Sequence, residues 1–205
     1  MVGSGKESDL IRDEELMLQF QQGNEASFRT LVDRHKQRVF NFTYRFLSGN
    51  ADCEDVAQEV FVKVYFSKES YKPSAKFTTW LYVVTRNTCL QALKKKGNTV
   101  SMNEKTQGKQ DEIGAVIADD RTETPSDAVL SAEKRTKIAE ALARLPESQR
   151  MVILLRRYDQ LSYEEIAEVM SCSVQSVKSL LFRGRVSLKE FLKEYFNEAV
   201  ETGRG

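Results

Sequence analysis

The chain has 205 residues, of which 40% are hydrophobic and 30% are charged, and its 31 basic and 30 acidic residues leave a net charge of +1. This composition excludes a disordered chain, and the length suffices for one large domain or two small ones. No apolar run approaches the ~20 residues that span a bilayer, and no secretory signal stands at the N-terminus, so we expect a cytosolic protein without membrane insertion.

Apolar residues recur at three- and four-residue steps up to about Lys96, which predicts four or five helices. The next thirty residues lack this periodicity and hold seven acidic against three basic side chains. Helical periodicity returns at Ala128, breaks at Pro146 and runs on to about Phe196. We therefore predict an all-α protein of two small helical domains, residues 10–97 and 128–198, joined by a flexible acidic linker over residues 98–127.

Charges are segregated in the first predicted domain. Acidic residues crowd the start of one helix, where carboxylates also favour the helix dipole: Asp52, Glu54, Asp55 and Glu59. Cations then dominate from Lys68 to Lys96, with Glu69 as the single acid. Six aromatic residues are interleaved with them: Tyr65, Phe66, Tyr71, Phe77, Trp80 and Tyr82.

Two interpretations of these aromatic residues stay open. Cations and aromatic faces together suit single-stranded DNA, because bases stack on the rings at roughly 1–3 kcal/mol each. The alternative is that most of the rings belong to the core, which we favour for Trp80 and Tyr82. Core packing accounts less readily for the polar loop Ser67–Lys76, which contains Pro73, than for these rings.

The second predicted domain contains a helix-turn-helix pattern. Ser162 and Glu165 form a capping box for a short helix from Tyr163 to Met170, and Ser173 can cap a second helix three residues later. One face of this second helix is apolar. The other face is polar and without acids, which suits a DNA major groove, and it carries Gln175, Lys178, Ser179, Phe182 and Arg183. A solvated amphipathic helix is the alternative.

Residues for chemistry are scarce. The three cysteines lie far apart and His35 is the only histidine, so we expect no metal site and small buried thiols. Adjacent acids such as Glu164 and Glu165 do not face each other on a helix. No phosphate-binding loop or nucleophile motif is present. We therefore predict no catalytic residue, no cofactor and no enzyme.

Three stretches in order resemble a bacterial RNA polymerase sigma factor of the extracytoplasmic-function (ECF) group. The segment 52–61 resembles the family's core-polymerase-binding helix, and 77–82 with Arg86 and Asn87 resembles its promoter-melting segment. The segments 145–150, 161–167 and 176–179 resemble its reader of the −35 element. The chain departs from many members in two places. The turn has Ser171 and Cys172 where glycine or proline is frequent, and Gly184 interrupts the second helix, whose end we expect to be looser.

The resemblance implies a transcription initiation factor and a role for each segment. Core RNA polymerase would be bound, at the clamp helices of its largest subunit, by Asp52, Asp55, Gln58 and Glu59. The −10 element would be melted and read as a single strand by Ser67, Lys72, Lys76, Arg86 and Asn87. The −35 duplex would be read by Gln175, Lys178, Ser179, Phe182 and Arg183.

Further partners follow from the same resemblance. The flap of the polymerase's second-largest subunit would be a second contact, and many members are held by an anti-sigma factor or recruited by another protein. The alternative function is a helix-turn-helix regulator that binds duplex DNA alone. It leaves the acidic helix unexplained, and it predicts specific promoter binding without polymerase.

Overall fold

The computed structural model describes residues 11–49, 52–100 and 125–202. Within them the regular structure is helical throughout, which confirms the predicted all-α class. In chain order the elements are α1 (Asp13–Gln21), α2 (Glu25–Phe46), α3 (Cys53–Phe66), the 3-10 turn η2 (Lys68–Ser70), α4 (Phe77–Val100), α5 (Pro125–Ala143), α6 (Glu147–Arg157), α7 (Tyr163–Met170) and α8 (Val174–Thr202).

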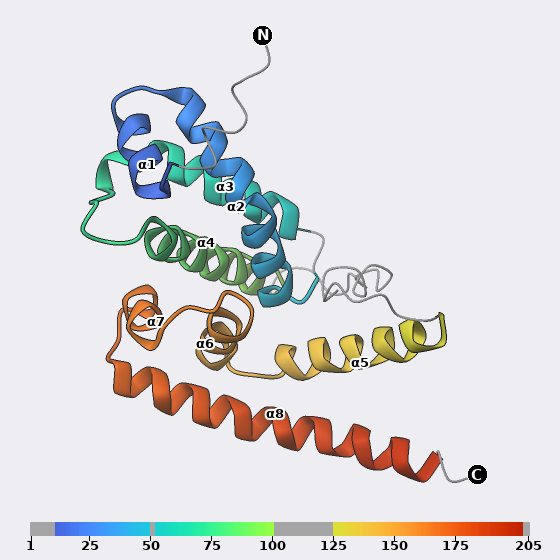
Figure 1. Cartoon of the computed structure of the whole chain (residues 1–205). Coiled ribbons are helices and arrows are strands. Elements are labelled where there is room, and N and C mark those ends of the chain that lie inside the picture. The colour runs from blue at the N-terminus through green and yellow to red at the C-terminus, as the bar shows by residue number, and fades with distance from the viewer. Residues whose placement is uncertain (1–10, 50–51, 101–124, 203–205) are drawn as a thin grey trace.

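The helix α4 lies at the centre of the molecule, with α1, α2 and α3 on one side and α5 to α8 on the other (Figure 1). Phe20, Val60 and Phe77 are fully buried where the first four helices meet. Ile166 and Leu154 are equally buried in a second cluster, which also includes Tyr82 of α4. The two halves of the chain therefore share a core through α4.

Helices reach into both ends of the predicted linker. The helix α4 continues to Val100 and α5 begins at Pro125, so residues 98–100 and 125–127 are helical. The remainder of the predicted acidic linker, residues 101–124, lies outside the described residues.

The helix-turn-helix forms with the predicted bounds and caps. Glu165 N donates to Ser162 Oγ at 3.1 Å and Ser162 N donates to Glu165 Oε2 at 2.7 Å, which completes the capping box of α7. Ser176 N donates to Ser173 Oγ at 3.1 Å at the start of α8. Between the helices, Ser171 takes the left-handed conformation at φ 53°, a region that glycine occupies without steric cost.

Gly184 lets α8 approach α6 closely. A Cβ atom at this position would lie only 2.7 Å from Ile153 Cδ1 and 3.3 Å from Gln149 Cβ. The helix continues through Gly184 without a break. Close packing, rather than flexibility, accounts for the residue.

Polar side chains join the two halves across their shared interface. Tyr82 on α4 donates a hydrogen bond to the buried carboxylate of Asp159, in the connection between α6 and α7. The guanidinium of Arg45 lies 4.1 Å from the ring centroid of Tyr158. Arg150 on α6 donates to the carbonyl oxygen of Phe46 at 2.7 Å. The interface is therefore specific as well as apolar.

Candidate nucleic-acid interface

The five residues predicted to read the −35 element come together on α8. They line one shallow groove on the surface of its first three turns: Gln175, Lys178, Ser179, Phe182 and Arg183. Phe182 is 70% exposed although its side chain is large and apolar. Val177 and Leu181, on the opposite face of the helix, are buried against the core. The groove therefore faces outward while the helix is fixed from behind.

The charge of this groove is uniformly positive. Lys178 and Arg183 are its ionisable residues, and the exposed Arg185 lies just beyond it. Ser179 Oγ donates to the backbone carbonyl oxygen of Gln175 at 3.0 Å, one turn earlier on the helix. We call this surface the α8 groove.

The residues predicted to act at the −10 element lie in two places. Ser67, Lys72 and Lys76 belong to the segment 67–76 between α3 and α4, which we call the −10 loop. Arg86 and Asn87 lie on α4, about 16 Å further along at 1.5 Å per residue. Lys72 and Asn87 are exposed, whereas Arg86 is half-buried and donates to Asn87 Oδ1 at 3.1 Å. The Ser67 hydroxyl is used internally, since it donates to the Lys63 carbonyl oxygen.

Lys76 forms an ion pair with the other half of the chain. Its ammonium lies 2.7 Å from Glu165 Oε1 on α7, the first helix of the helix-turn-helix. This ion pair raises the pKa of Lys76 and lowers the pKa of Glu165. The structure therefore places a candidate −10 residue against the half of the protein that contains the helix-turn-helix.

Most of the aromatic residues that alternate with cations are core residues. Tyr71, Phe77 and Tyr82 are at most 3% exposed. For these rings the prediction of base stacking is wrong and the core interpretation is correct. Trp80 is half-buried and packs against the rings of Tyr71 and Phe77. Phe66 is the exception, at 80% exposure.

The four residues predicted to bind polymerase share the outer side of α3 and the residue before it. Asp52, Asp55 and Gln58 are exposed, and Glu59 forms an ion pair with Lys63 at 2.8 Å. The same side continues into two exposed apolar residues, Val62 at 53% and Phe66 at 80%. These two flank a groove between α2 and α3, with Phe28, Phe40 and Phe61 among its other lining residues.

Sequence reasoning did not assign Val62 and Phe66 to this surface. The signal was their spacing, because positions 55, 58, 62 and 66 recur at three- and four-residue steps on one helix face. Exposed large apolar side chains next to a polar stripe are typical of protein interfaces. We call this surface, from Asp52 to Phe66, the α3 face.

The three cysteine thiols are wholly or partly buried. Cys53 and Cys89 are buried and Cys172 is half-buried, and burial raises the pKa of the Cys89 thiol to about 12. Among the described residues, no group of three or more His, Cys, Asp or Glu side chains is arranged to hold a metal ion. No helix in that part of the chain is long and apolar enough to cross a membrane.

Comparison with known proteins identifies the family to which the two halves of the chain belong. Residues 31–99 match the family Sigma-70 region 2, and residues 135–188 match Sigma-70, region 4. The ECF RNA polymerase sigma factor SigW of Bacillus subtilis is 32% identical over 178 residues, which cover 86% of this chain and 94% of that protein. The chain belongs to the ECF sigma factors. It is thus a transcription initiation factor that recognises promoters, and the stand-alone regulator is not favoured.

Other ECF sigma factors align over nearly their full length. The sigma-E factor of Haemophilus influenzae is 35% identical over 181 residues, covering 87% of this chain and 94% of its own. Two solved structures share the fold at 22% identity: CnrH in complex with the cytosolic domain of CnrY, at a TM-score of 0.63, and RpoE of Bartonella quintana in complex with the anti-sigma factor NepR, at 0.65. They cover 89% and 81% of this chain, and 97% and 96% of their own chains.

Proposed function

We propose that this ECF sigma factor reads the −35 duplex through the α8 groove. The observation that supports this assignment is that five donor-rich or apolar side chains, with no acid among them, line one exposed surface. Lys178 and Arg183 can neutralise phosphates, and together with Gln175 they can hydrogen-bond base edges in the major groove. The exposed ring of Phe182 suits contact with a thymine methyl group or a sugar.

The −10 element would be opened and read by the −10 loop with Arg86 and Asn87. Lys72 is exposed and can hold the phosphate backbone. The Asn87 side chain offers both a donor and an acceptor, which suits the edge of an unpaired base. Lys76 can also contact the DNA phosphates once its ion pair with Glu165 is broken.

Core RNA polymerase would bind the α3 face, at the clamp helices of its largest subunit. Carboxylates of Asp52, Asp55 and Glu59 with the Gln58 amide supply polar contacts, and Val62 and Phe66 supply an apolar anchor. The flap of the second-largest subunit would bind the C-terminal half. In this division, residues 10–97 form the region-2 domain, 98–127 the linker and 128–198 the region-4 domain.

Three further assignments belong to this proposal. The chain would have no catalytic activity of its own, since the polymerase supplies the chemistry. It would act in the cytoplasm with the polymerase. It would also be regulated by an anti-sigma factor or another recruiting protein, as the RpoE–NepR complex illustrates for a protein of the same fold.

The test starts from promoters mapped by transcript start sites in cells that overproduce the chain. Holoenzyme reconstituted with Lys178→Ala or Arg183→Ala should lose −35 engagement by roughly 1–3 kcal/mol while core binding is retained. Lys189→Ala, an exposed cation on α8 outside the α8 groove, is the control. Asn87→Ala should change the −10 base preference only.

Two results would contradict the proposal. Tight and specific promoter binding by the isolated chain, equal to that of the holoenzyme, would favour a stand-alone regulator. Loss of core binding in Asn87→Ala would show that the division of labour between α3 and α4 is wrong.

A further inference from the structure

The helix α1 contacts the −10 loop at both of its ends. At the first end, Gln21 Nε2 donates to the carbonyl oxygens of Lys68 at 2.7 Å and Tyr71 at 3.1 Å. At the other end, Phe77 N donates to Glu14 Oε1 at 3.0 Å, so the carboxylate caps the start of α4. One nine-residue helix thus fixes where the −10 loop begins and where it ends.

Additional contacts hold the inner side of the −10 loop. The ammonium of Lys68 lies 4.7 Å from the ring centroid of Phe20 on α1. The buried Tyr71 hydroxyl donates to the Ala75 carbonyl oxygen at 2.9 Å and so ties the loop across its own width. Lys72, Pro73 and Ser74 are exposed. The −10 loop is therefore anchored from beneath while its tip stays open to a ligand.

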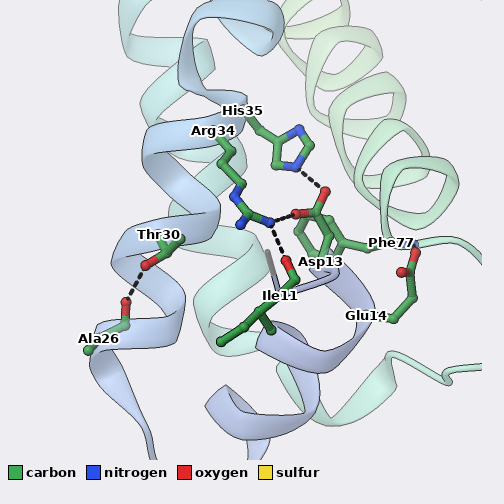
Figure 2. A network of polar contacts seen from close by, with 8 residues as sticks. All are labelled: Ile11, Asp13, Glu14, Ala26, Thr30, Arg34, His35 and Phe77. Atoms are coloured by element: carbon green, nitrogen blue, oxygen red, sulfur yellow. Dashed lines mark hydrogen bonds and ion pairs between the residues drawn. The ribbon is translucent and has the colours of Figure 1, made fainter. Parts of the chain in front are cut away.

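The helix α1 is itself fixed by contacts that do not involve the −10 loop (Figure 2). Asp13 accepts a hydrogen bond from Arg34 at 2.6 Å and lies 2.7 Å from His35 Nε2, both on α2. Arg34 also donates to the Ile11 carbonyl oxygen at 2.8 Å. Burial opposes the charge of Asp13, but the hydrogen bonds from His35 and Arg34 outweigh it and lower the pKa of Asp13. The support is thus anchored on α2 and can impose its position on the loop.

We propose that α1 positions the −10 loop, and that Gln21 and Glu14 are positioning residues that set −10 base selectivity without touching DNA. The inference rests on the proposed role of the −10 loop. A loop that reads an unstacked base must present its backbone and side chains in one arrangement, because a mobile loop binds the right and the wrong base with similar affinity. Second-layer hydrogen bonds to backbone groups are what holds such arrangements.

Gln21 offers a clean chemical test because a single atom change reverses its role. In Gln21→Glu the donor becomes an acceptor of the same shape, and it then faces two carbonyl oxygens. The matched control is Gln19→Glu, the same change two residues earlier on α1. The side-chain oxygen of Gln19 accepts from Ser27 Oγ at 2.6 Å, and a carboxylate at this position keeps that bond.

The experiment measures open-complex formation by the holoenzyme on a promoter library with randomised −10 positions. Gln21→Glu should reduce discrimination between preferred and other bases by about tenfold, which corresponds to about 1.4 kcal/mol. Gln19→Glu should keep the wild-type profile, and all variants should bind core polymerase and the −35 element equally. An unchanged −10 profile in Gln21→Glu would overturn the proposal.

Glu14 provides a second, independent variant pair. Glu14→Ala removes the acceptor for Phe77 N and should flatten the same −10 profile, whereas Glu14→Gln keeps an acceptor oxygen and should restore it. If Glu14→Gln and Glu14→Ala have equal melting temperatures and equally flat −10 profiles, the positioning role of Glu14 is wrong.

Failure of this inference is distinguishable from failure of the proposed function. Lys72→Ala changes the tip of the −10 loop itself. If Lys72→Ala weakens open-complex formation on all −10 sequences while Gln21→Glu leaves the profile unchanged, only the positioning role of α1 is wrong. If neither variant changes open-complex formation, the −10 assignment of the loop is also wrong.

Discussion

Arg150 is a buried cation that joins three helix ends. Besides the Phe46 carbonyl at the end of α2, its guanidinium donates to the carbonyl oxygen of Ala143, the last residue of α5, at 3.0 Å and to that of Leu145, just after α5, at 3.2 Å. Carbonyl groups at helix C-termini have no partner within their helix, and a planar fork of donors can satisfy several at once. Burial lowers the pKa of Arg150, yet such a group stays charged at neutral pH.

Arg150→Ala should therefore lower the free energy of unfolding by about 3 kcal/mol, because it leaves buried carbonyl oxygens without donors. Arg150→Lys should recover only part of this loss, since an ammonium cannot reach all three carbonyl groups. Denaturant unfolding measures the effect, with the exposed Arg185→Ala as the control. Equal stabilities of Arg150→Ala and Arg185→Ala would refute this role.

At the scale of elements, contact between α6 and α8 depends on the missing side chain of Gly184. Alanine there would gain about 1 kcal/mol of helix propensity but would clash with Ile153. The sequence alone showed only the propensity cost, because a close approach between two helices is a property of their packing.

Gly184→Ala should destabilise the protein by about 1 kcal/mol in the natural background. In an Ile153→Val background, where the clashing Cδ1 is gone, the same change should become neutral or stabilising. A double-mutant cycle by thermal unfolding measures this coupling. If the effects of the two substitutions simply add, the close approach to Ile153 is not the reason that position 184 requires glycine.

At the scale of the molecule, the two halves contact each other, although their proposed DNA elements lie far apart. Positions −35 and −10 are separated by about 25 base pairs, or about 85 Å of duplex. Lys76 of the −10 loop cannot remain at Glu165 of the helix-turn-helix while both elements are engaged. Reading both at once requires the interface to open.

Asp159 makes that interface depend on pH. Burial raises its pKa to about 6, although the Tyr82 hydrogen bond and the charges of Arg38 and Arg45 act in the opposite direction. The unfolded chain releases this proton near pH 4. Between about pH 4 and 6 the folded chain binds more protons, so its stability falls as the pH rises through this window.

Asp159→Asn should remove this pH dependence and stabilise the folded protein at pH 7.5 by about 3 kcal/mol, because the two pKa values differ by about two units at 1.36 kcal/mol each. Denaturant unfolding at pH 5 and 7.5 measures it, and small-angle scattering reports whether the halves stay together. The exposed Asp33→Asn is the control. A variant that still loses stability between pH 5 and 7.5 as the natural chain does would count against Asp159.

Local signals predicted much of this structure. Periodicity and caps predicted the helix class and the bounds of α7, and the polar spacing on α8 predicted the five residues of the α8 groove, because each depends on neighbours along the chain. The support of the −10 loop by Gln21 and the pairing of Lys76 with Glu165 join residues 47 and 89 positions apart. No local pattern encodes such contacts.

Glu165 uses its two carboxylate oxygens for two purposes, one for the cap of α7 and one for Lys76. For a geneticist, this makes the residue a poor source of hyperactive alleles. A substitution of Glu165 that frees Lys76 also removes the cap of α7. Release from the interface is therefore accompanied by a loss of stability in the helix-turn-helix. A selection for variants that escape restraint should instead return changes at Tyr82, whose hydroxyl donates to Asp159 across the interface.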